Sequence, residues 1–295
     1  MLKLDEKKIR KGKPVGLPYQ GSKKKVAKKV VEIIKQNFGA DKTVYDVFGG
    51  GGAITAECLL NGLDVKYNDH CKFITSAFQK VINSDRDWLK TLIVSRDEFF
   101  KIHEKPSKTL DDELKLLINS FGNNRRNYLY AKSFSDDKYR LAVDIIAKHD
   151  CFAGYKQTDT YKSALSMWRA EKNKKIEQLE RLQQLERLQQ LGRLEATNKD
   201  YRAFTDVKCA VFYLDPPYEG ANVDGYTDSK CFNHSEFYDW VVEMSRENIV
   251  LLSSYTVSDA RFEEVFRFET ARSTLSGGMG KTRCEKIFMV RGGRK

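Results

Sequence analysis

The segment Asp215-Pro216-Pro217-Tyr218 directly follows a run of large apolar residues, 211–214, that is typical of a buried strand. Two prolines lack N–H groups and fix φ, so the chain must leave the strand in a rigid turn. The carboxylate then stands at the carboxyl end of a strand, where open α/β sheets bind ligands. With a backbone carbonyl, it can accept both N–H groups of an aromatic amine and localise the lone pair of the nitrogen. We therefore predict that these four residues are catalytic, with the tyrosine stacking on a base rotated out of a duplex.

A second motif, Asp46-Val47-Phe48-Gly49-Gly50-Gly51-Gly52, places four glycines after a short β-branched and aromatic run. Glycines let a backbone approach a ligand closely. The dinucleotide fingerprint fails, because Ile54 or Thr55 stands where its last glycine is needed. A phosphate loop ending at Lys281 fails too, because Leu275 replaces its first glycine. A glycine loop without phosphate geometry suits S-adenosylmethionine, which carries no phosphate.

Asp69 follows the next apolar run, 63–68. An acid at the end of this strand can accept both ribose hydroxyls of an adenosine. The same residue could equally serve as a helix N-cap or turn residue. Both interpretations remain open from the sequence.

The elements that must position these residues follow from local patterns. Apolar spacing predicts helices at 26–38 and 53–61 and strands at 43–48, 63–68, 210–214, 249–253 and 286–290. Strand, glycine loop, helix, strand and acid in this order are typical of a doubly wound α/β domain. From about 70 to 195 helical patterns dominate. We expect an α/β domain split into 1–70 and 196–295 by a mostly helical insertion, 71–195.

A short repeat at 178–195 carries leucine at every third position, at 179, 182, 185, 188, 191 and 194. A helix advances about 100° per residue, so such leucines drift around the cylinder instead of forming one stripe. We expect a helical or irregular spacer, with an interaction surface as the alternative.

The chain of 295 residues has a net charge of +11, and its first 29 residues hold eleven Lys and Arg against two acids. A concentrated basic surface attracts polyanions, although a merely solvated surface has the same composition. The six cysteines form no CxxC pair, which argues against a zinc knuckle and for reduced thiols in the cytoplasm. Cys231 is expected to be a buried thiol and not a nucleophile. No apolar run is long enough to span a membrane, and the N-terminus does not resemble a secretory signal.

Together, the motifs give the chain a resemblance to a known family. The order 19–23, 46–55, Asp69, 198–201 and 215–218 resembles the Dam-type adenine-N6 DNA methyltransferases, the D12 class of the alpha group, in its phage and restriction-modification branch. The resemblance spans nearly the whole chain and is weakest across 70–195, where such enzymes carry their target-recognition domain. It implies a Rossmann-like S-adenosylmethionine-dependent methyltransferase sheet with helices on both faces.

The resemblance also implies roles for matching positions. Asp200 and Tyr201 correspond to the pair that contacts the adenine of the cofactor, Asp69 to the ribose-binding acid, and Asp215 to the catalytic carboxylate near the methionine moiety. The residues that we expect to bind S-adenosylmethionine are Tyr19, Lys23, Asp46, Phe48, Gly49, Gly50, Gly51, Asp69, Asp200, Tyr201 and Asp215. Tyrosine at 19 stands where some members have tryptophan, and Gly21-Ser22-Lys23 replaces Gly-Gly-Lys.

A cluster of amides, cations and rings in the insertion is typical of DNA recognition. We predict that Asn123, Asn124, Arg125, Arg126, Tyr128 and Lys132 bind double-stranded DNA; a solvated basic loop is the alternative. His234 and Glu236 are given no chemistry.

The expected reaction is attack by N6 of a flipped-out adenine on the methyl group of S-adenosylmethionine, with no metal. Alternatives are a cytosine-N4 or RNA-adenine amino-methyltransferase and, from another class, a non-catalytic DNA-binding protein of the same fold. We expect a cytoplasmic monomer or weak dimer, functionally paired with a restriction endonuclease in some contexts.

Overall fold

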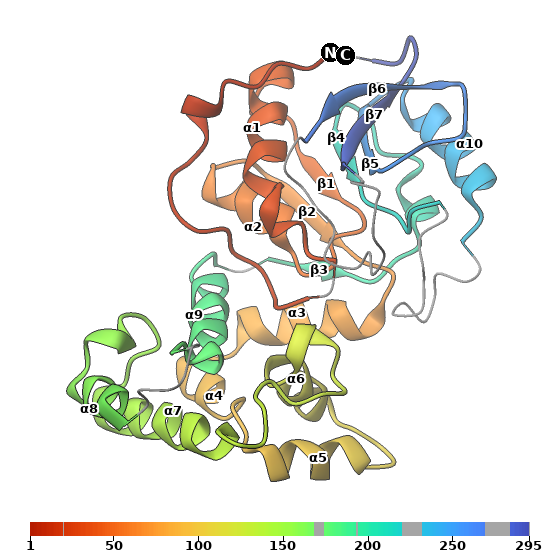
Figure 1. The fold of residues 1–295 in the computed structure, drawn as a ribbon. Helices are drawn as coiled ribbons and strands as arrows, with labels where there is room; N and C mark the ends of the chain where they lie inside the picture. Colours follow the sequence, from red (N-terminus) through yellow and green to blue (C-terminus); the bar gives the residue numbers. More distant parts are fainter. Residues whose placement is uncertain (20, 168–173, 193, 220–231, 269–283, 295) are drawn as a thin grey trace. The chain divides into compact units, whose positions relative to one another are not determined.

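The structure of the chain is a computed structural model. It describes residues 1–19, 21–167, 174–192, 194–219, 232–268 and 284–294 (Figure 1). Cys231, Leu275 and Lys281 lie outside these residues. The chain divides into two compact units, one of residues 1–16, 21–79 and 193–295 and the other of 17–20 and 80–192. Each unit is described by itself.

The first unit is built on a seven-stranded sheet. Its strands, in chain order, are β1 (Val44–Asp46), β2 (Val65–Asn68), β3 (Ala196–Thr197), β4 (Val211–Leu214), β5 (Ile249–Ser254), β6 (Phe262–Arg267) and β7 (Lys286–Val290). They lie in the order β3-β2-β1-β4-β5-β7-β6. The strands from β3 to β5 pair in parallel, and β7 is antiparallel to both of its neighbours. The strand order therefore reverses between β1 and β4, and such a switch point is where sheets of this class bind ligands.

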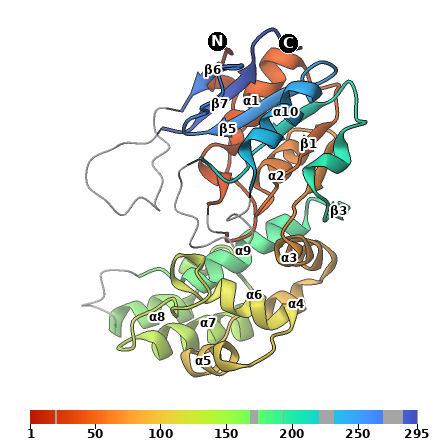
Figure 2. The same cartoon turned by 90° about the vertical axis from the view of Figure 1, so that its right-hand side faces the viewer.

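Helices cover both faces of this sheet. On one face, α1 (Ala27–Phe38) and α2 (Ala53–Leu60) pack against alternate side chains of β1, β4, β5 and β7. The other face is covered by α10 (His234–Met244) (Figure 2). Phe237 and Val241 of this helix belong to one buried cluster with Phe212 of β4 and Leu252 of β5. Strands covered on both faces must be apolar throughout, and all four side chains of β4 are buried. The unit also contains the 3-10 turns η1 (Glu6–Lys8), η2 (Lys23–Lys25) and η5 (Tyr201–Phe204).

The second unit is helical in the part that the structure describes. It contains α4 (Arg86–Lys90), α5 (Arg96–Glu104), α6 (Leu110–Ile118), α7 (Ser135–His149), α8 (Asp159–Met167) and α9 (Glu177–Gln189), with 3-10 turns η3 (Phe121–Asn123) and η4 (Tyr155–Gln157). Helix α3 (Lys72–Asn83) runs across the boundary between the two units. The predicted α/β fold with a mostly helical insertion is confirmed. The observed boundary falls after Gln79, because Phe78 of α3 stacks on Tyr67 of β2 with ring centroids 4.4 Å apart.

The leucine repeat is helical over α9, as one form of the expectation had it, and its leucines lie in the core of the second unit. Leu179, Leu182, Leu185 and Leu188 of α9 are all fully buried. Each step of three residues moves a side chain back by about 60°, so the four leucines cover about half of the helix circumference. Arg181, on the same side, donates to the backbone carbonyls of Leu117 and Ile118 at the end of α6, at 3.2 and 2.6 Å. Because the helix is covered over about half of its circumference, its leucines can be buried without forming a narrow apolar stripe.

Candidate active site

Three carboxylates lie at the carboxyl ends of three neighbouring parallel strands. Asp46 ends β1 and is in register with Tyr67 on β2 and Tyr213 on β4. Asp69 and Asp215 each follow two residues after those tyrosines. The acids predicted separately from two motifs and a strand end therefore belong to one edge of the sheet, around the switch point between β1 and β4.

Asp215 is paired with a lysine that precedes the first long helix. Lys23, in η2, places its Nζ 2.9 Å from Asp215 Oδ1, and both side chains are more than four-fifths buried. Burial raises the pKa of Asp215 to about 6; Lys23 opposes this rise and Glu285 adds to it. Burial alone would lower the pKa of Lys23, but Asp215 and Glu285 hold that pKa above its ordinary value. The lysine is therefore an ammonium at neutral pH.

The turn that follows Asp215 is anchored at two points. Tyr218 OH accepts a hydrogen bond from Lys23 Nζ at 2.6 Å and lies 3.1 Å from Ser253 Oγ on β5. The carbonyl of Pro217 lies 2.9 Å from His234 Nε2 at the start of α10, at hydrogen-bonding distance. His234, to which the sequence assigned no chemistry, thus has a structural contact with the turn 215–218.

Asp46 is a buried acid that binds the first turn of α2. Its Oδ2 accepts the backbone N–H of Thr55 at 3.1 Å and the Thr55 hydroxyl at 2.6 Å. Gly52 precedes this helix and has no side chain to cap it, so the carboxylate of Asp46 satisfies a free N–H of the first turn. Burial raises the pKa of Asp46 to about 7 against these two hydrogen bonds. Asp46 thus stabilises the helix start that follows the glycine loop. Its direct contact with a cofactor stays a prediction.

Neighbouring aromatic rings leave no room for a Cβ at two of the four positions of the glycine loop. A Cβ on Gly52, whose φ is +70°, would lie 2.1 Å from the Phe78 ring, and one on Gly49 would lie 2.3 Å from the Tyr67 ring. Tyr67 also donates its hydroxyl to the carbonyl of Gly50 at 2.8 Å. The loop is thus held against β2 and α3 by two aromatic rings.

Asp69 contacts this loop directly. Its Oδ2 accepts the N–H of Gly50 and its Oδ1 accepts the N–H of Cys71, both at 2.8 Å. The second bond is the turn contact that the sequence left open as an alternative. The first places the acid beside the glycine loop, and its contact with a ribose stays a prediction.

Residues 198–201 meet the same edge of the sheet. Asn198 Nδ2 donates to the carbonyls of Asp69 and His70, both at 2.8 Å. Tyr201 stacks with Phe48 at a centroid distance of 6.3 Å, so two aromatic residues predicted to bind the cofactor lie together. Asp200 caps η5 and pairs with Arg202, which lowers the pKa of this carboxyl.

Two sets of predicted residues lie in the second unit. Tyr19 falls in the segment 17–20 of that unit, so its cofactor contact stays a prediction. In the predicted DNA-binding set, Arg126 and Lys132 are exposed, whereas Arg125 pairs with Glu113 at 2.9 Å. Asn124 Oδ1 accepts the N–H groups of Arg126 and Asn127 and so shapes the loop.

Tyr128 does not belong with the exposed residues of this loop. It is only 5% exposed, and its hydroxyl donates to the carbonyl of Val94 at 2.8 Å. Phe121, in contrast, is 66% exposed on the same loop. The sequence showed that an aromatic residue was present, but the register of the loop decides which ring faces solvent.

Sequence reasoning also missed Glu285 and Ser253. Neither belongs to a motif: Glu285 precedes β7, and Ser253 is one of two serines that end β5. Ser253 Oγ donates to Glu285 Oε1 at 2.8 Å, and that oxygen is 3.3 Å from Lys23 Nζ. The strand order of the sheet brings both residues to Asp215.

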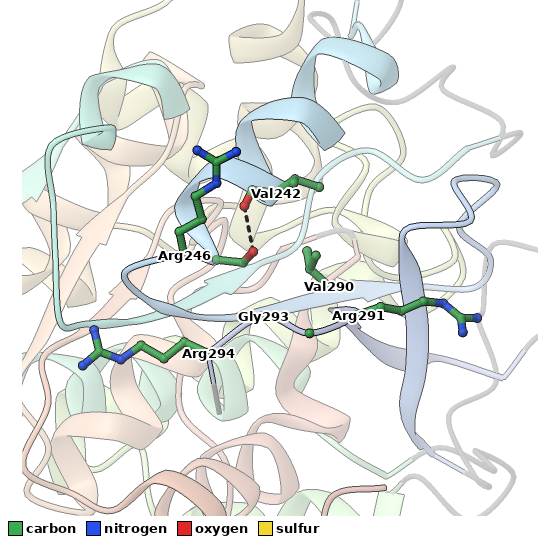
Figure 3. A pocket seen from close by; sticks show the side chains of 8 residues that line it. Val242, Arg246, Val290, Arg291, Gly293 and Arg294 are labelled. Carbon is green, nitrogen blue, oxygen red and sulfur yellow. Dashed lines mark hydrogen bonds between the residues drawn. The ribbon is translucent and has the colours of Figure 1, made fainter.

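A pocket of about 440 Å³ lies at the opposite end of the sheet, between the end of α10 and the end of β7. Its arginines, Arg246, Arg291 and Arg294, point away from one another (Figure 3). The pocket therefore offers no convergent polar groups for a ligand.

Among the residues that the structure describes, no group of three or more His, Cys, Asp or Glu side chains could hold a metal ion. Within the same residues, no helix is long and apolar enough to cross a membrane.

Comparison with known proteins agrees with the geometry of this edge. None of the curated proteins matches the chain. A family model, described as D12 class N6 adenine-specific DNA methyltransferase, matches residues 19–271 and thus includes the turn 215–218, the glycine loop, Asp69 and the helical insertion. The predicted enzyme class and reaction are confirmed at the level of the family. The chain belongs to the D12 class of N6 adenine-specific DNA methyltransferases.

Proposed function

We propose that this enzyme transfers the methyl group of S-adenosylmethionine to N6 of an adenine rotated out of double-stranded DNA, with Asp215 as the catalytic carboxylate. The observation that carries this assignment is the position of Asp215 at the switch point of the sheet. Two prolines follow it directly, and the ammonium group of Lys23 lies beside it. A rigid acceptor there needs little reorganisation during the reaction.

Asp215, Lys23 and Tyr218 have different roles toward the N6 amine. Asp215 Oδ2 and a carbonyl of the proline turn accept the two N–H bonds of N6, which makes its lone pair available. Lys23 fixes the other carboxylate oxygen and keeps the group ionised. Tyr218, the last residue of the turn, is held in place by contacts of its hydroxyl with Lys23 and Ser253.

The residues present fit S-adenosylmethionine. When bound, this donor supplies a methyl group on a sulfonium, and it carries ribose hydroxyls and an adenine ring. Asp69 is the acid beside the glycine loop and is proposed to bind the hydroxyls, Phe48 and Tyr201 form an aromatic surface for the ring, and the glycine loop lets the backbone approach. The acids of this edge favour a cation over an anion.

The reaction is tested by incubating the protein with duplex DNA and S-adenosylmethionine, digesting the DNA to nucleosides and identifying the product by mass. We expect N6-methyladenine. N4-methylcytosine, or transfer only to RNA, would contradict the substrate; cofactor binding without any transfer would support a non-catalytic protein.

The cofactor site is tested by calorimetry on an Asp69→Ala variant. Loss of both ribose contacts should weaken S-adenosylmethionine binding by about tenfold or more, since each hydrogen bond to a charged group contributes about 1.5–3 kcal/mol. Asp64→Ala, an acid of the same unit outside the site, is the matched control. Equal affinities for both variants would contradict the ribose assignment.

The exposed loop of the second unit is our proposal for DNA recognition. It presents Arg126 and Phe121 to solvent, with Lys132 nearby in sequence. Arg126→Ala should weaken binding of duplex DNA while leaving S-adenosylmethionine affinity unchanged. Lys148→Ala on α7 serves as the control, and equal DNA affinities for both variants would argue against the loop.

The remaining expectations stay predictions: the phage or restriction-modification branch, a functional pairing with a restriction endonuclease, a monomer or weak dimer, and a cytoplasmic location.

A further inference from the structure

Glu285 and Ser253 close a ring of hydrogen bonds around the catalytic turn. Lys23 Nζ donates to Tyr218 OH at 2.6 Å, and Ser253 Oγ donates to Glu285 Oε1 at 2.8 Å. The Tyr218 hydroxyl lies 3.1 Å from Ser253 Oγ and is also hydrogen-bonded to Asp215. Lys23, Tyr218, Ser253 and Glu285 thus form one connected network beside Asp215.

The ammonium of Lys23 has three N–H bonds and three acceptors within reach. They are Tyr218 OH at 2.6 Å, Asp215 Oδ1 at 2.9 Å and Glu285 Oε1 at 3.3 Å. Two carboxylates therefore share one cation. With all three groups ionised, the cluster carries a net charge of −1.

This charge matters for the reaction. N6 becomes positively charged when the methyl group moves to it and the sulfonium of the donor becomes a neutral thioether, until an N6 proton leaves to solvent. A neutral pair of Asp215 and Lys23 would stabilise that charge weakly, whereas a cluster with one excess negative charge stabilises it in a site of low dielectric. Burial of Glu285 at 8% exposure makes its charge effective at this distance.

We propose that Glu285 is a positioning residue that neutralises Lys23, so that the negative charge of Asp215 remains available to the amine. Ser253 holds Glu285 and Tyr218 in this arrangement. The inference rests on the proposed role of Asp215 and adds to it a charge that neither the motifs nor the family match assigns.

The test compares two variants of Glu285 that distinguish the effect of its charge from the effect of its contact with Lys23 and Ser253. Glu285→Gln keeps the length and an acceptor oxygen but removes the charge; Glu285→Asp keeps the charge but shortens the reach. The first should lower kcat by about tenfold to a hundredfold with little change in KM for S-adenosylmethionine, and the second should retain more activity. Glu243→Gln, an exposed acid on α10, is the control.

A second readout needs no substrate. Glu285 raises the pKa of Asp215, so the substitution Glu285→Gln should lower the pKa of Asp215. The other titratable residues that face this carboxyl are still present in the variant: Lys23, Tyr213, Tyr218 and Asp46. Carboxyl ¹³C NMR, with Asp215→Asn for assignment, measures this pKa in the full protein. The acid limb of the kcat profile should move to lower pH in parallel.

The outcomes separate this inference from the proposed function. An unchanged Asp215 pKa in Glu285→Gln, or a fall in thermal stability with kcat unchanged, overturns the role of Glu285 alone. Full activity of Asp215→Asn instead overturns the catalytic assignment itself.

Discussion

The Nζ atom of Lys23 lies 2.9 Å from Oδ1 of Asp215, although the lysine precedes the first long helix and the aspartate follows the fourth strand. This ion pair joins the N-terminal motif to the catalytic motif. It involves Oδ1 of Asp215, and Oδ2 is the oxygen that we propose accepts from the adenine amine.

The rate of methyl transfer should fall as the pH drops through about 6. The pKa of Asp215 is raised to this value by burial, so below it the carboxyl carries a proton and loses an acceptor. Asp46 also has a raised pKa and lies at the same edge. A kcat profile of Asp46→Asn distinguishes them: the limb near pH 6 should persist, and its disappearance would identify Asp46 as the titrating group.

Asp46 should also make the stability of the protein depend on pH. Its pKa is raised to about 7 in the folded state, so the folded protein binds more protons than the unfolded chain between about 4 and 7. This group therefore lowers the free energy of unfolding as the pH rises through that window. In Asp46→Asn, whose amide oxygen can still accept from Thr55, that contribution should vanish. Denaturant titrations at pH 5 and pH 8 measure the difference, and identical pH dependence in both proteins would contradict it.

Gly52→Ala should destabilise the glycine loop by about 2–4 kcal/mol, from overpacking and from left-handed backbone strain. The new Cβ would meet the buried Phe78 ring at 2.1 Å. Gly62→Ala is a matched control, because Gly62 has a similar φ of +74° and nothing within 4 Å of its Cβ. It should cost only about 1 kcal/mol. Equal losses in thermal or denaturant unfolding would show that the contact with Phe78 is unimportant.

Leu185→Ala should destabilise the second unit by about 2–5 kcal/mol, as expected for a fully buried leucine. Gln183→Ala, two residues earlier on α9 and only half-buried, should change the free energy of unfolding by less than about 1 kcal/mol. A spacer would give two small and similar effects. Limited proteolysis with mass mapping assigns the loss to residues 80–192.

The sequence predicted most elements of the sheet because their signals are local. Glycines end α1 and α2, the run before Asp215 is apolar throughout, and the two prolines fix the turn. The sequence placed Asp69 and Asp215 directly after predicted strands, and the structure shows that these acids and Asp46 share one edge of the sheet. Strands β3 and β6 were missed, because one has two residues and the other carries charged residues between its buried ones.

The role of Glu285 could not be predicted, because it depends on strand order. Only the insertion of antiparallel β7 between β5 and β6 brings this residue next to Ser253 and Lys23. The burial of Tyr128 and of the leucine repeat depends in the same way on tertiary packing. Residue types and spacing identify a motif, but they do not show which neighbours cover it.

The most direct test of the central claim is single-turnover methylation of duplex DNA by Asp215→Asn beside the unmodified enzyme, with DNA and S-adenosylmethionine affinities measured on the same preparations. Asparagine keeps the size of the side chain and removes the charge that the amine requires. We predict that N6-methyladenine formation is lost by at least about a hundredfold while both affinities change little. Methylation at the unmodified rate, with both ligands bound, would contradict the claim that the Asp215 carboxylate activates the amine.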